Sequence, residues 1–108
     1  MTNTTTRKHQ LLTQELRASL PALYSQENVA DPVARVKFFS PYSNWTWYAL
    51  EFDGDDTFFG LVEGFESELG YFSLSELDTL VVNIGVPVPG VERDVHWTPR
   101  PLSEIRGK

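Results

Sequence analysis

The residues best suited to acid–base chemistry lie near the end of the chain, where His96 follows Asp94 by two positions and directly precedes Trp97. A histidine titrates near neutrality and can exchange protons when a carboxylate lies beside it. Adjacent residues of a strand point to opposite faces, however, and the chain offers no matching nucleophile. We expect His96 to be a structural or surface residue. A small enzyme or ligand-binding domain that uses these three residues is the alternative hypothesis.

Clustered carboxylates suggest a second kind of chemistry. The run Asp53-Gly54-Asp55-Asp56 carries the oxygen ligands that Ca²⁺ prefers, but a calcium-binding loop also needs glycine at its sixth position and glutamate at its twelfth. Counted from Asp53, those positions hold Phe58 and Gly64. Asp-Gly is instead typical of a β-hairpin turn, because both residues tolerate positive φ. We therefore expect a turn and no metal site.

Other catalytic patterns are incomplete. Glu63, Glu66 and Glu68 have the residue type of glycosidase acid–base pairs, but they fall at a predicted strand end and turn, where solvated carboxylates are ordinary. The segment from Gly60 to Gly64 lacks the lysine and the serine or threonine hydroxyl that a phosphate-binding loop needs. The chain has no cysteine, which excludes thiolate ligands, a cysteine nucleophile and disulfides. We expect no catalytic residue, no metal and no cofactor.

The distribution of charge is more informative than the net charge of −6. No Lys or Arg occurs between Lys37 and Arg93, so this segment should present a negative surface. Such a surface repels nucleic-acid phosphates, which makes direct nucleic-acid binding unfavourable, and it suits a basic protein partner. The acidic residues expected to contact a partner are Glu51, Asp53, Asp55, Asp56, Glu63, Glu66 and Glu68.

Aromatic residues are concentrated in the same part of the chain. Twelve of the fourteen lie in residues 38–72. In a strand, Trp45 and Trp47 would point to one face of the sheet, and Tyr48 and Phe52 to the other. Large rings on both faces indicate either an exposed contact surface or a second core that the terminal segments cover. Trp45, Trp47 and Tyr48 are therefore candidate partner-binding residues.

The elements that would position these residues follow from periodicity and turn signals. Helices are predicted over residues 11–20, with Thr13 as N-cap, and over residues 74–82, where Ser73 and Glu76 form a capping box. Strands are predicted over residues 34–39, 45–52 and 58–65, with short strands at 71–72 and 95–97. This order predicts an α+β fold: a three- to four-stranded antiparallel meander sheet with short helices packed on one face.

A chain of 108 residues fits one domain, which we expect over residues 11–108, after a polar, disordered tail at residues 1–10. No apolar stretch approaches the ~20 residues that cross a bilayer. Arg7 and Lys8 are not followed by an apolar run, so the N-terminus is not expected to be a signal peptide or membrane anchor. These features predict a cytoplasmic protein.

Several short runs are distinctive when taken together. They lie at residues 11–16, 36–39, 44–48, 51–54, 58–62, 68–77, 92–94 and 101–104. In these runs the chain resembles a family of short bacterial proteins catalogued as domain of unknown function 2958. The resemblance implies a protein of plasmids, phages or integrative elements, encoded beside DNA-transfer and anti-restriction genes. It implies no catalytic residues.

These observations favour a non-enzymatic protein-interaction module from mobile DNA. Small inhibitors that block a basic nucleic-acid-binding groove present carboxylates in place of phosphates, so an inhibitor of a host nuclease defence, anti-restriction or anti-CRISPR, is the concrete form of this hypothesis. An accessory subunit of a plasmid-maintenance complex would show the same sequence features and stays open beside it.

Overall fold

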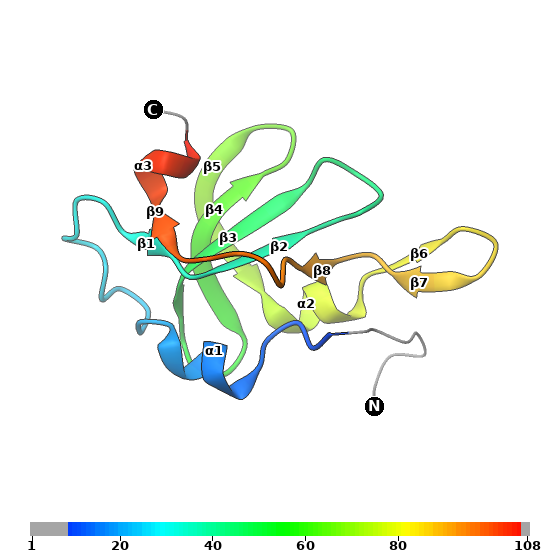
Figure 1. Cartoon of the computed structure of the whole chain (residues 1–108), viewed down its shortest axis with the longest axis horizontal. Helices are drawn as coiled ribbons and strands as arrows, with labels where there is room; N and C mark the ends of the chain where they lie inside the picture. The colour runs from blue at the N-terminus through cyan, green and yellow to red at the C-terminus, as the bar shows by residue number, and fades with distance from the viewer. Residues whose placement is uncertain (1–8, 107–108) are drawn as a thin grey trace.

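The structure is a computed structural model that describes residues 9–106, and it contains three short helices and nine strands within that range (Figure 1). The helices are α1 (Gln14–Ser19), α2 (Leu74–Thr79) and α3 (Leu102–Ile105). The strands are β1 (Val33–Ala34), β2 (Val36–Phe39), β3 (Thr46–Phe52), β4 (Thr57–Glu63), β5 (Ser67–Ser73), β6 (Val81–Asn83), β7 (Pro87–Pro89), β8 (Glu92–Arg93) and β9 (Arg100–Pro101). The α+β class predicted from the sequence is confirmed.

The main sheet has five antiparallel strands in the order β5-β4-β3-β2-β8. This is one strand more than expected, because the two-residue strand β8 joins the β2 edge. Strand β5 is also longer than the predicted residues 71–72 and pairs with β4 over seven residue pairs without interruption. The sheet therefore ends in a two-residue edge strand on one side and a seven-residue edge strand on the other.

Both faces of the sheet are covered. The residues of the larger core are Leu11, Leu12, Val36, Phe38, Trp47, Ala49, Phe52, Phe58, Leu77 and Val91. The smaller core lies on the opposite face and consists of Ala34, Tyr48, Leu50, Leu61 and Leu102, with Phe59, Trp97 and Ile105 packed against it. Helix α3 therefore packs on the other face from α1 and α2, and the prediction that the helices share one face is wrong.

Phe58 lies at the centre of the larger core. It is fully buried, and its ring centroid is 4.5 Å from that of Phe52, 5.0 Å from that of Phe72 and 5.5 Å from that of Phe38. Burying one such ring contributes about 2 kcal/mol, and favourable ring pairs add to this. The aromatic content of residues 38–72 is thus largely the core itself.

The predicted N-caps Thr13 and Ser73 are confirmed, but the first helix begins at Gln14 rather than at residue 11. The Thr13 side chain accepts the N–H of Leu16, and that of Ser73 accepts the N–H of Glu76. Helix α2 ends at Thr79, earlier than predicted, because the chain then forms the hairpin of β6 and β7. The strand predicted over residues 95–97 is wrong: Val95 and His96 form a turn, and Trp97 has no regular secondary structure.

Most of the tail predicted at residues 1–10 lies outside the described residues. Within residues 9–106, no helix is long and apolar enough to cross a membrane.

Candidate interaction site

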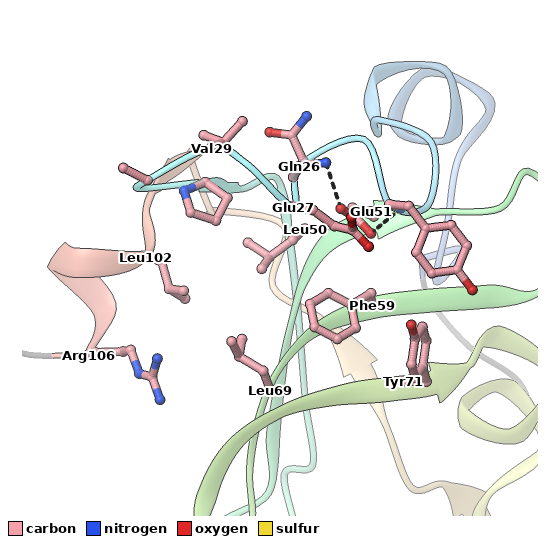
Figure 2. Close-up of a pocket in the computed structure, with 13 residues that line it drawn as sticks. Gln26, Glu27, Val29, Leu50, Glu51, Phe59, Leu69, Tyr71, Leu102 and Arg106 are labelled. Carbon is pink, nitrogen blue, oxygen red and sulfur yellow. Dashed lines mark hydrogen bonds between the residues drawn. The ribbon is translucent and has the colours of Figure 1, made fainter.

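A cavity of about 430 Å³ lies beside the smaller core, between the loop of residues 22–32, strands β3, β4 and β5, and helix α3 (Figure 2). Its floor is apolar, formed by Leu50, Phe59 and Leu102. Polar groups of Glu27 and Arg106 stand at its margin, on opposite sides in Figure 2. The size and the mixture of an apolar floor with a few polar groups are typical of ligand or side-chain pockets.

A β-bulge in β3 shapes one wall of this cavity. The pairing of β3 with β4 passes from Ala49–Gly60 directly to Glu51–Phe59, so Leu50 is an extra residue. Leu50 and Glu51 consequently lie on the same face, and the alternation of the strand is reversed beyond this point. The bulge turns the Glu51 side chain towards the loop of residues 22–32.

Glu51 fixes that loop. Its carboxylate is buried, only 3 % exposed, and its two oxygens accept the backbone N–H groups of Tyr24 and Gln26, each at 2.8 Å. Tyr24 has a φ of 70°, which is unusual for a residue with a Cβ atom. The two hydrogen bonds hold the loop in this strained shape, so Glu51 is a structural residue of the cavity wall. Glu51 is therefore not part of the acidic surface on which the sequence placed it.

Two tyrosines meet at the cavity mouth. Tyr24 and Tyr71 are 60 % and 57 % exposed, although both line the cavity. A hydrogen bond that the Tyr71 hydroxyl donates to the Tyr24 hydroxyl raises the pKa of Tyr71 above its ordinary value of 10.0, and the nearby carboxylates of Glu51 and Glu27 act in the same direction. The Tyr71 hydroxyl therefore stays neutral at physiological pH and can donate and accept hydrogen bonds.

A second hollow, of about 470 Å³, lies around the tip of the β4–β5 hairpin and shares Leu69 and Tyr71 with the first. Phe65 at the tip is 95 % exposed, and its ring packs edge-on against Trp45 with 5.6 Å between centroids. Gly64 permits this contact, because a Cβ there would come within 2.5 Å of the Trp45 ring. Phe65 of the hairpin tip and Trp45, which precedes β3, thus place two aromatic rings at this hollow.

The other predicted aromatic residues are not on the surface. Trp47 and Tyr48 are 9 % and 8 % exposed and belong to the larger and smaller cores. Trp97 covers Tyr48 with 5.5 Å between ring centroids, and its indole N–H donates to the Ala34 carbonyl at 3.0 Å. The C-terminal segment therefore covers this face. Of the three predicted residues, Trp45 alone is partly exposed, and it lines the hollow at the hairpin tip.

The predicted acidic residues divide into two groups. Asp53, Asp55 and Asp56 lie in the β3–β4 turn, whereas Glu63, Glu66 and Glu68 lie at the opposite end of β4. Seven residues of β4 separate the groups by about 20 Å. They therefore cannot act as one site on a small ligand.

The carboxylates of the β3–β4 turn are largely engaged within the protein. One oxygen of Asp53 accepts three backbone N–H groups, including that of Thr57, and these bonds lower the pKa of Asp53. Asp56 accepts the Ser73 hydroxyl and the Ser75 backbone N–H, and the Ser73 bond is the main reason that the pKa of Asp56 is lowered. Both carboxylates shape the turn and the start of α2.

The residues around His96 do not form one catalytic cluster. His96 is exposed in its turn, and its backbone N–H donates to Asp94. Asp94 also pairs with Lys37 at 3.8 Å. Asp94 and Trp97 line a cavity of about 360 Å³ that does not include His96 among its lining residues. Among residues 9–106, no group of three or more acidic or histidine side chains is placed to hold a metal ion.

Sequence reasoning missed Tyr24, Phe65, Leu69 and Tyr71, the apolar residues around the two hollows. Only Phe65 had a signal, since an aromatic residue beside Gly64 at a strand end suggests a turn that exposes it. The exposure of Leu69 and Tyr71 follows from β5 being the last strand of the sheet, and that of Tyr24 from the path of the loop of residues 22–32; no local pattern predicts either.

The fold and the site define a class of protein: a small α+β domain whose sheet is covered on both faces and has one long edge strand open between two hollows. The chain belongs to the family described as "Protein of unknown function (DUF2958)", which matches it over residues 11–105. The resemblance inferred from the sequence runs is thereby confirmed. Comparison with curated proteins and with solved structures gave no match.

Proposed function

We propose that the protein is a non-enzymatic interaction module that binds another protein through strand β5 and the adjacent hairpin tip. We call this region the β5 surface and define it by Tyr24, Phe65, Glu66, Glu68, Leu69 and Tyr71. The observation that carries the proposal is its exposed apolar area: Phe65 is 95 % exposed, and Leu69 is 43 % exposed. Contiguous exposed aromatic and aliphatic side chains around a hollow are typical of protein contact surfaces.

The charge of the β5 surface indicates a basic partner. Glu66 and Glu68 are exposed, and Glu27 lines the first cavity. Residues 38–92 contain no Lys or Arg, and Arg106 is the cationic residue that borders the first cavity. A partner with Lys or Arg around an apolar contact would therefore associate faster and more selectively than a neutral one.

The concrete form of the proposal is an inhibitor, carried on mobile DNA, of a host nuclease defence such as restriction or CRISPR. Nucleases of this kind bind nucleic acid through basic grooves, which an acidic domain can occupy. An accessory subunit of a plasmid-maintenance complex would use the same surface chemistry. The captured partner distinguishes the two, and the inhibitor form also requires that the purified protein slow DNA cleavage by that partner.

The test is affinity capture from nuclease-treated bacterial lysate with the wild type and two double variants. Phe65→Ser with Tyr71→Ser removes apolar area from the β5 surface. Ile84→Ser with Val86→Ser is the matched control, because these residues are 57 % and 59 % exposed on the distant β6–β7 hairpin. We expect a basic protein that the wild type and the control retain and the β5 variant loses. Equal retention by all three proteins would refute the proposed surface.

A further inference from the structure

We infer that the partner binds by adding a strand to the free edge of β5, and that the added strand alternates apolar residues with Lys or Arg. This inference rests on the proposed function, and it specifies how the β5 surface recognises its partner. Three features carry it: the direction of the backbone groups of β5, the lack of lysine, proline or a bulge in this edge strand, and the hollows on either side of it.

The backbone groups of alternate β5 residues point away from the sheet. Hydrogen bonds at both ends of the β4–β5 pairing fix the alternation: Gly64 N–H donates to the Glu66 carbonyl at 2.9 Å, and Leu74 N–H donates to the Asp56 carbonyl at 2.8 Å. Since hydrogen-bonded and non-hydrogen-bonded pairs alternate in an antiparallel ladder, Glu68 and Gly70 bond to β4. Their neighbours Ser67, Leu69 and Tyr71 therefore direct N–H and C=O groups outward.

Strand β5 lacks most of the usual protection of an edge strand, and Glu68 is its one charged residue. Natural edge strands are commonly kept from pairing by lysine, proline, a bulge, very short length or a covering segment. The sequence of β5, Ser-Glu-Leu-Gly-Tyr-Phe-Ser, has no lysine or proline, and its pairing with β4 shows no bulge. Within residues 9–106, no strand pairs with its outer side. Strand addition at such an edge is an established mode of peptide recognition.

The two hollows fit an alternating strand. Leu69 and Tyr71 lie on the face with the 430 Å³ cavity, so partner residues opposite them would place side chains towards its apolar floor. Glu68 and Gly70 lie on the face with Trp45, where the space around Gly70 is open. A partner residue opposite Glu68 is favoured if it is cationic. The added strand should therefore carry apolar side chains on one face and basic side chains on the other.

The first experiment uses a synthetic probe, a seven-residue peptide that alternates lysine and valine with both ends blocked. At a peptide concentration ten times Kd, we expect the amide protons of Ser67, Leu69 and Tyr71 to exchange about tenfold more slowly with solvent. Those of Glu68 and Gly70 should change little, because they already bond to β4. A peptide that alternates glutamate and valine is the charge control and should bind at least about tenfold more weakly.

Two perturbations remove backbone hydrogen-bond donors, one in β5 and one in the peptide. Leu69→Pro removes an outward N–H without breaking the β4 ladder, and Leu69→Ala is its control because it shortens the side chain but keeps the N–H. Only the proline variant should lose more than about tenfold in affinity. Should the proline variant fail to fold, N-methylated peptides replace it. Only alternate amides of an added strand bond to β5, so these belong to one residue type of the peptide. Methylating the amides of that type, lysine or valine, should abolish binding, and methylating those of the other type should not.

The outcomes separate this inference from the proposed function. If lysate capture depends on the β5 surface but Leu69→Pro captures the partner normally, strand addition is wrong and the proposed function stands. Equal slowing of exchange at all β5 amides would also overturn the strand-addition inference. Equal loss of affinity for the two methylated peptides would do the same. Equal binding of the glutamate peptide would overturn the basic character of the occupant. Protection that rises with protein concentration in the absence of peptide would show that a second copy occupies the edge, and would overturn the inference.

Discussion

Replacing Glu51 by alanine should destabilise the protein strongly although it removes a carboxylate from an acidic chain. The Glu51 side chain is buried and accepts the backbone N–H groups of Tyr24 and Gln26, each at 2.8 Å. A substitution to alanine leaves both donors without this acceptor. It also releases Tyr24 from its positive φ, so the loop of residues 22–32 should move away from the cavity.

The expected magnitude follows from the two lost bonds. A buried donor left unsatisfied costs about 1–3 kcal/mol, and the lower half of that range applies because both N–H groups are partly accessible. The sum is about 3 kcal/mol, which is a large part of the roughly 5–15 kcal/mol that holds a small domain folded. With a urea slope of about 1.5 kcal/mol per molar, the midpoint of unfolding should fall by about 2 M.

Urea unfolding of Glu51→Ala measures this loss, with Glu27→Ala as the control. Glu27 is exposed in the same loop, so its substitution should change the unfolding free energy by no more than about 0.5 kcal/mol. Hydrogen exchange should show faster exchange of the Tyr24 and Gln26 amides in Glu51→Ala alone. An unfolding free energy within about 0.5 kcal/mol of the wild type would refute the argument that this carboxylate fixes the loop.

Three further predictions concern backbone clearance and ionisation. Gly60→Ala should cost more than about 3 kcal/mol in urea unfolding, because its Cβ would overlap a carbonyl oxygen of β3, whereas Gly70→Ala, with open space, should cost less than about 1 kcal/mol. Tyr24→Phe should lower the pKa of Tyr71 in an ultraviolet titration, because it removes the hydrogen bond that raises that pKa; an unchanged pKa would contradict this contact. The pKa of Asp56 is lowered from 3.8 in the folded protein, so its contribution to stability is present above that value and is lost as the pH falls through the folded-state pKa. In Asp56→Asn, unfolding free energies measured across this range should depend less on pH, and an unchanged pH profile would contradict the assignment.

The sequence could predict those features whose causes are local. Thr13 and Ser73 cap helices because their side-chain oxygens reach amides three residues ahead, and this geometry needs only adjacent chain. The Asp53-Gly54 turn is equally local, and Gly54 has the expected positive φ of 90°. The period of β2 also predicted its burial, with Val36 and Phe38 inside.

The site was less predictable because its causes are long-range. Simple alternation places Tyr48 and Phe52 on one face, but the extra residue at Leu50 moves Phe52 into the larger core and turns Glu51 inward. No residue near Leu50 signals the bulge. The burial of Tyr48 likewise depends on Trp97, which is distant in sequence. Residue type alone placed Glu51 with the surface acids, whereas its acceptors are used by a loop about 25 residues away.

The two covered faces explain why a binding surface would lie at the edge of the sheet. Since both faces carry cores, the most exposed aromatic side chains of the main sheet lie around its β5 edge, and the outward-directed backbone groups of β5 lie there too. An edge of this kind would also pair with a second copy of the chain. Glu66 and Glu68, together with the net charge of −6, oppose that pairing by like-charge repulsion while attracting a basic segment. The same carboxylates can therefore act as attraction to the partner and as protection against self-association. Raising the salt concentration should then weaken binding of the lysine–valine peptide and strengthen self-association. If both affinities changed in the same direction, charge would not be what favours the peptide over a second copy of the chain.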